Sequence, residues 1–206
     1  RDKKAFERNR GLKGIQFLSS NVSKWNESIS LPIFQSADSV AVFEKMRNFQ
    51  DLGINIENSW FVRPYSEFHA TNDGPKKNKI FELDYESCPE EYWPVYKGNS
   101  FEIWQADTNE YYGGADPKIA LDVIQKKRER GPAFREFERA ILKDIETIPA
   151  LHPRIAFRQV SRSTDSRTII TSLVPPKVFL TNAAPYFLWI RGSQKDQAYL
   201  LGVLSS

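Results

Sequence analysis

Arginine and hydroxyl side chains are concentrated between residues 154 and 168. These fifteen residues include four arginines and five serines or threonines. Arginine presents a planar fork of N–H donors that suits phosphate oxygens and guanine edges, and serine and threonine add short donors for phosphate oxygens. The chemistry that this stretch could perform is recognition of a nucleic acid. A solvated strand face followed by an ordinary polar hairpin turn would have the same composition.

A strand period of two divides the start of this stretch between two faces. Ile155 and Phe157 would face one side, and Arg154, Ala156 and Arg158 the other. We expect the arginine face and the polar turn after it to point outward, toward a duplex. A lysine at a separate turn, just before a glycine, could reach a phosphate as well. The candidate DNA-contacting residues are Lys97, Arg154, Arg158, Ser161, Arg162, Ser163, Thr164, Arg167 and Thr168.

Patterns for catalysis or metal binding are missing from the sequence. His69, His152 and the single Cys88 supply neither a nucleophile–base pattern nor the spacing of a transition-metal site. Residues 174–177 (VPPK) lack the polar first residue and the aromatic last residue of the Asn/Asp-Pro-Pro-aromatic motif of adenine methyltransferases. We expect no catalytic residue, metal or cofactor in this segment. The alternative is a hydrolase or nuclease whose clustered carboxylates, among residues 82–91, bind Mg²⁺.

The charge of the chain is unevenly distributed. Residues 1–117 contain 14 Lys/Arg and 18 Asp/Glu, a balance of −4, whereas residues 118–195 contain 15 Lys/Arg and 7 Asp/Glu, a balance of +8. A polyanion would therefore meet the second half of the chain first. Charge alone does not establish that the chain binds a polyanion, because many basic domains bind no anion.

Aromatic residues gather in the segment 92–104. Tyr92, Trp93, Tyr96 and Trp104 could stack on flipped or single-stranded bases. Side chains of this kind more commonly fill a core, and we expect them to do so here.

Helix signals flank the centre and the end of the chain. Asp116 as cap and Pro117 at the first helical position begin a helix, and Gly131-Pro132 ends it. Apolar spacing predicts a second helix over residues 134–145 and an earlier one from Asp38 or Ser39 to Gly53. Ser193 and Asp196 resemble a capping box that opens a terminal helix. Strands are expected at residues 60–63, 80–83, 92–98, 101–104, 154–160, 168–174, 177–181 and 186–190.

This order of elements predicts an α+β fold. A mostly antiparallel sheet would be combined with two central helices and a C-terminal helix. With no apolar run of about 20 residues and no signal segment, we expect no membrane association and a cytoplasmic location. The only methionine is Met46, and we expect the chain to be an excerpt from a longer polypeptide.

Four blocks together resemble the region that follows the catalytic motif in large adenine-specific DNA methyltransferases of type IIG restriction–modification and BREX-like phage-defence systems. They span about two-thirds of the chain, in the order found in that family. The blocks are residues 60–63 with 67–73 (WFVR, EFHATND), 93–98 (WPVYKG), 154–168 (RIAFRQVSRSTDSRT) and 200–206 (LLGVLSS). After the second block the sequence departs from the family pattern, because it continues as Asn99-Ser100-Phe101-Glu102.

The resemblance implies a target recognition domain at residues 36–206, joined by a connector at residues 1–35 to an upstream catalytic domain. That upstream domain would bind S-adenosylmethionine and methylate N6 of adenine, and the parent enzyme could carry an endonuclease too. The partners would be double-stranded DNA and the methyltransferase domain of the same polypeptide. The alternative is a docking segment that joins the methyltransferase to a nuclease or partner subunit without binding DNA.

Overall fold

The computed structural model describes residues 36–49, 52–162, 165 and 167–206. The chain forms two compact units, Arg1–Asp51 and Leu52–Ser206. The predicted connector at residues 1–35 lies outside the described residues. The first described helix belongs to the first unit.

In the first unit, helix α3 (Ala37–Met46) begins slightly earlier than we expected. Ser36, rather than Asp38 or Ser39, is the N-cap, and its hydroxyl accepts a hydrogen bond from the Ser39 N–H at 3.2 Å. The helix ends at Met46, well before Gly53.

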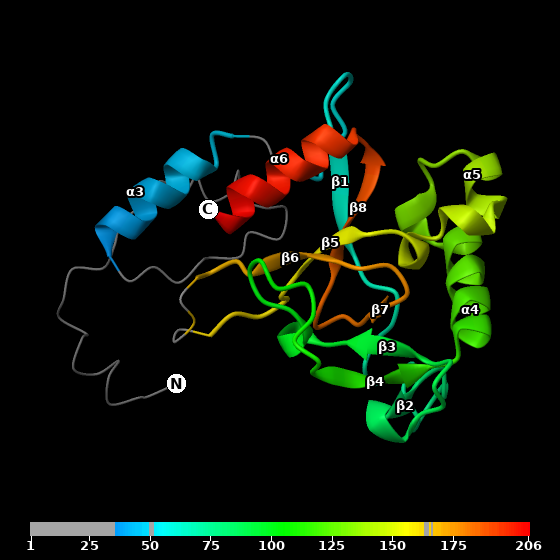
Figure 1. The fold of residues 1–206 in the computed structure, drawn as a ribbon. Coiled ribbons are helices and arrows are strands. Elements are labelled where there is room, and N and C mark those ends of the chain that lie inside the picture. Colours follow the sequence, from blue (N-terminus) through cyan, green and yellow to red (C-terminus); the bar gives the residue numbers. More distant parts are fainter. Residues whose placement is uncertain (1–35, 50–51, 163–164, 166) are drawn as a thin grey trace. The chain divides into compact units, whose positions relative to one another are not determined.

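The described strands of the second unit form two four-stranded sheets (Figure 1). The first sheet has the order β1-β8-β5-β6 and is antiparallel throughout. The second has the order β2-β4-β3-β7, in which β3 and β7 run parallel. The strands are β1 (Phe61–Tyr65), β2 (Glu82–Leu83), β3 (Trp93–Tyr96), β4 (Tyr111–Ala115), β5 (Arg154–Phe157), β6 (Thr171–Val174), β7 (Phe179–Leu180) and β8 (Tyr186–Arg191). The predicted α+β fold with mostly antiparallel sheets is confirmed.

The pairing of β3 with β7 in the second sheet is buried on both faces. Tyr96 of β3 pairs with Leu180 of β7, and both belong to a core shared with residues of β5, β6 and β8. Their neighbours Val95 and Phe179 also pair, and they face a second core that contains Ile124. Successive residues of a strand point to opposite sides, so the two residues of β7 and their partners in β3 contribute side chains to both cores.

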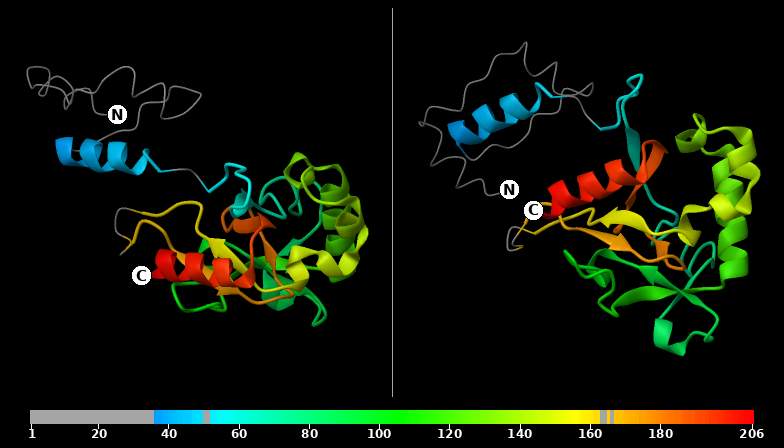
Figure 2. Two further views of the ribbon diagram at one scale, coloured as in Figure 1. Left: turned by 90° about the horizontal axis from the view of Figure 1, so that it is seen from above. Right: turned by 45° about the horizontal axis from the view of Figure 1, so that its top comes forward.

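Helices α4 (Pro117–Arg130) and α5 (Arg139–Lys143) lie together at one side of the sheets (Figure 2). The predicted cap is confirmed, because Asp116 accepts a hydrogen bond from the Lys118 N–H at 2.8 Å. The predicted helix at 134–145 is shorter. Arg128 and Thr147 both donate to the carbonyl of Ile141, which a longer α5 would use within the helix.

Short 3₁₀ helices and the C-terminal helix complete the second unit. The 3₁₀ helices are η1 (Tyr85–Ser87), η2 (Gly98–Ser100), η3 (Pro132–Phe134), η4 (Ile145–Thr147) and η5 (Pro149–Leu151). Helix α6 (Gln194–Ser205) begins with the predicted capping box, in which Ser193 Oγ and the Ser193 N–H both pair with Asp196. Within the described residues, no helix combines the length and apolar character that spanning a membrane requires.

The expected strand at residues 101–104 is wrong. The antiparallel partner of β3 is β4, which contains Gly113-Gly114. Residues 98–100 instead form η2, and a tight turn follows between Glu102 and Gln105. A Cβ on Gly113 would overlap the carbonyl oxygen of Glu82, so the close approach of β2 requires glycine there.

Candidate nucleic-acid interface

Two segments far apart in the sequence meet at one end of the sheets. They are the loop after β3 (residues 97–110) and the connection between β5 and β6 (residues 158–170), whose described parts are seen in Figures 1 and 2. Arg158 Nη2 donates to the carbonyl oxygen of Phe101 at 3.0 Å and also pairs with the Glu102 carboxylate. A Cβ on Gly98 would lie 3.7 Å from Cγ of Arg158, so the arginine stem packs directly over this turn.

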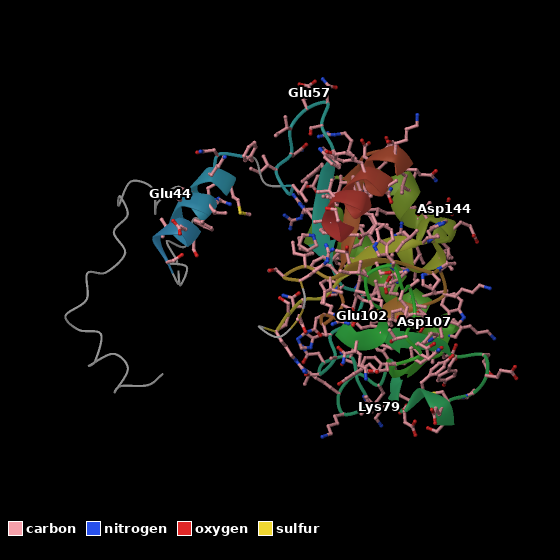
Figure 3. The ribbon with its side chains drawn as sticks, turned by 60° about the vertical axis from the view of Figure 1, so that its left-hand side comes forward. Glu44, Glu57, Lys79, Glu102, Asp107 and Asp144 are labelled. Atoms are coloured by element: carbon pink, nitrogen blue, oxygen red, sulfur yellow. The ribbon has the colours of Figure 1, made fainter. Side chains whose placement is uncertain are left out.

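A polar cavity of about 430 Å³ lies between the two segments. Its walls include side chains of both charges, and Glu102 is labelled in Figure 3. The lining residues are Gly98, Asn99, Glu102, Thr108, Glu110, Arg158, Val160, Arg162 and Asp165. The cavity therefore presents both donors and acceptors, as the edges of bases require, whereas phosphate oxygens would use only the donors.

Arg154 is enclosed in the protein and does not face outward as we expected. Its side chain is 5% exposed, and Nη2 donates to Glu67 Oε2 at 3.0 Å and to the Val178 carbonyl at 2.8 Å. Burial raises the pKa of the Glu67 carboxyl above its ordinary value, and Arg154 opposes that rise. Arg154 and Ala156 do share a face of β5, but this face lies against the core rather than in solvent. Arg154 therefore has a structural role, and its burial contradicts the expectation that it contacts DNA.

Arg158 is also largely enclosed. Its side chain is 10% exposed, compared with 49% for its partner Glu102. Because its guanidinium is already bound by Glu102 and Phe101, it ties the loop after β3 to the end of β5. The structure therefore favours a positioning role for Arg158 over a direct contact with a duplex.

The remaining described candidates are accessible. Arg162 and Thr168 are exposed, and Ser161 is half-buried. Arg167 is exposed and donates to the carbonyl oxygen of Ser206. The Arg162 N–H donates to Asp165 Oδ2 at 2.7 Å, and this hydrogen bond holds the backbone of Arg162 close to the Asp165 side chain. Ser163 and Thr164 lie outside the described residues.

Lys97 belongs to the loop after β3, one residue before Gly98 of the cavity wall. Its side chain is 36% exposed, and its Nζ is 3.8 Å from Glu110 Oε2. A pair this long and this exposed is weak, so Lys97 can exchange it for another anion. The structure thus brings Lys97 and Arg162 to neighbouring segments, although the sequence separates them by more than sixty positions.

Asp107 holds the loop after β3 in shape. Its Oδ2 accepts hydrogen bonds from Tyr96 Oη at 2.6 Å and Tyr111 Oη at 3.0 Å, and its Oδ1 accepts one from the Asn109 N–H at 2.7 Å. Burial and the bond to Asp107 raise the pKa of Tyr111 to about 12, and the same causes raise the pKa of Tyr96. Both phenols therefore remain donors at neutral pH, and these bonds favour one conformation of the loop. The sequence did not identify Asp107, because its partners come from two strands.

The aromatic residues of segment 92–104 have different environments. Tyr96 is fully buried, as expected, and Trp93 stacks on Phe179 with ring centroids 5.4 Å apart. Trp104, in contrast, is 74% exposed, so the expectation that it fills the core is wrong. It lies in the tight turn that begins at Glu102.

Comparisons with models of known protein families, with curated protein sequences and with solved structures gave no match. Among the described residues, no group of three or more histidine, cysteine, aspartate or glutamate side chains is placed to hold a metal ion.

Proposed function

We propose that residues 52–206 recognise double-stranded DNA as the target-recognition part of an adenine-N6 DNA methyltransferase. One observation carries the proposal: the basic loop after β5 and the turn at Lys97 meet around one polar cavity. The resemblance of the four sequence blocks supplies the enzyme class. S-adenosylmethionine and the chemistry would belong to the upstream methyltransferase domain of the same polypeptide.

In this proposal the exposed cations contact the phosphates. Lys97, Arg162 and Arg167 are accessible enough to do so, and such contacts fix the register of a protein on a duplex. Arg158 holds the two segments together and Arg154 stabilises the sheet beneath them. The target adenine would swing out toward the upstream domain, because its amino group cannot be reached within the stack.

A salt titration of DNA binding tests the proposal. The 206-residue chain is titrated with a fluorescent duplex at several salt concentrations, and the slope of log K against log salt is compared between variants. Each phosphate contact contributes about 0.9 to that slope, so Arg162→Ala combined with Arg167→Ala should lower it by about two. The matched control replaces two other exposed arginines, Arg135 and Arg139, by alanine.

The control should bind like the unmodified chain. Binding that does not depend on salt, or equal losses in the two double variants, would refute the proposal. If the complete enzyme bound DNA equally well after replacement of Arg162 and Arg167, a docking role between the methyltransferase and a partner subunit would be favoured instead.

A further inference from the structure

We infer that Trp104 is a stacking residue that inserts against an unstacked base when the duplex binds. The inference rests on the proposed function and adds to it a residue that acts on the base stack. Trp104 is 74% exposed, and it lies two positions after Glu102, which lines the polar cavity and pairs with Arg158.

Two backbone hydrogen bonds close the turn that carries this side chain. The Glu102 N–H donates to the Gln105 carbonyl at 2.9 Å, and the Gln105 N–H returns a bond to the Glu102 carbonyl at 3.0 Å. These two bonds close the turn, in which Trp104 has a φ of 63°. Glycine or asparagine usually occupies such a position. Because the turn already orders the backbone, only the two side-chain torsions of Trp104 remain to be ordered on binding.

The surroundings favour a nucleic acid over a protein as the partner. The turn adjoins the cavity whose lining combines Arg158 and Arg162 with the carboxylates of Glu102, Glu110 and Asp165. Its neighbours Glu102 and Gln105 are polar and exposed. Single-stranded and flipped bases are held by aromatic rings placed beside cationic grooves, and apolar side chains act as wedges between base steps. Large exposed apolar patches mark protein-docking surfaces. Within this turn, Ile103 is half-buried and Glu102 and Gln105 are exposed and polar, so the indole does not continue into such a patch there.

The test first selects a duplex from a randomised library with the unmodified chain. The selected duplex is then labelled with 2-aminopurine at each purine in turn, and both affinity and fluorescence are measured. The main variant is Trp104→Gly, because glycine adopts a positive φ without strain and so removes the ring while keeping the turn. Trp104→Phe is the conservative variant, and Tyr199→Ala removes another exposed aromatic, from helix α6.

We expect Trp104→Gly to bind the selected duplex about 5- to 150-fold more weakly, the range found when an aromatic that stacks on a base is removed. It should also lose a fluorescence change that the unmodified chain produces at one position. Trp104→Phe should retain most of both, and Tyr199→Ala all of both.

If Trp104→Gly retains the affinity and the 2-aminopurine signal, the inference is overturned while the proposed function stands. Contact of the exposed ring with a protein partner would then be favoured. If the unmodified chain selects no duplex, the proposed function fails and the inference fails with it. The two failures are therefore distinguishable.

Discussion

Arg154 and Glu67 form a buried ion pair that joins residues 87 positions apart. The two side chains are 5% and 0% exposed, and Glu67 Oε2 also accepts the Leu180 N–H at 2.7 Å. Arg154 further donates to the carbonyls of Pro149 and Val178. One guanidinium and one carboxylate thus connect the segment after β1 with β5 and β7, which belong to different sheets.

Removal of the arginine should therefore make the second unit easier to unfold. Arg154→Met leaves the Glu67 carboxylate buried without its counter-ion, and such losses cost about 3–5 kcal/mol. Denaturant unfolding measures the change. Adding Glu67→Gln should restore part of the stability because it removes the unpaired charge. If Arg154→Met alone were as stable as the unmodified chain, the pair would have no structural role.

Replacing each of two glycines by alanine should change the stability of the second unit in opposite directions. A Cβ on Gly113 would overlap the Glu82 carbonyl, so β2 must move away from β4, and overpacking of this kind typically costs about 1–3 kcal/mol. Gly202 lies within α6, where an added Cβ would have no atom of the described residues within 4 Å apart from its chain neighbours and the backbone of its own helix. Gly202→Ala should therefore stabilise by about 0.5–1 kcal/mol. Thermal unfolding of both variants checks the signs; a stabilising Gly113→Ala would contradict the β2–β4 pairing.

The loop after β3 should lose its order when Asp107 is replaced. Asp107→Ala removes the acceptor shared by Tyr96 and Tyr111 and the acceptor for the Asn109 N–H. Hydrogen exchange of residues 101–110 should become faster, whereas exchange in α4 should not change, because α4 packs against the other core. Equal acceleration in both regions would indicate global destabilisation instead.

Asp73 should make stability depend on acid pH. Partial burial raises its pKa, but hydrogen bonds from the His69 N–H, Lys127 and Asn78 lower it below the ordinary value of 3.8. Because the folded-state pKa lies below the unfolded one, the carboxylate stabilises the fold above the unfolded pKa, and this contribution is lost as the pH falls through the folded pKa.

The comparison with Asp73→Asn isolates this effect. Unfolding by urea at several pH values should give a stability difference between the two proteins that is largest near neutral pH and shrinks below about pH 3.8. A difference that stays constant with pH would show that the charge of Asp73 is not responsible.

Local signals in the sequence were sufficient where short-range hydrogen bonds determine structure. Asp116 begins α4 and Ser193 begins α6 as predicted, because a cap depends on residues two or three positions away. The α+β class followed from the order of such elements. Strand β4 was not foreseen, since Gly113-Gly114 is a poor strand former. The close approach of β2 explains Gly113, and the side chains of Tyr85 and Cys88 explain Gly114.

The accessibility of the candidate site residues depends on tertiary contacts that local sequence patterns do not reveal. Alternation correctly placed Arg154 and Ala156 on one face of β5, but it could not show that the core covers that face. The burial of Arg158 depends on Phe101 and Glu102, which are more than fifty positions away. Arg162 and Lys97 keep accessible side chains in the folded unit, and no local pattern distinguishes them from the two enclosed arginines.

The pairing of β1 with β8 has a consequence for biosynthesis. The first strand of the second unit pairs with its last one, with Tyr65 opposite Tyr186. During translation β1 therefore has no β8 to pair with until almost the whole unit has emerged from the ribosome. Topologies dominated by such distant pairings fold slowly and leave strand edges uncovered in the meantime. The nascent chain should accordingly depend on chaperones, and truncation before β8 should yield aggregates rather than a smaller folded protein.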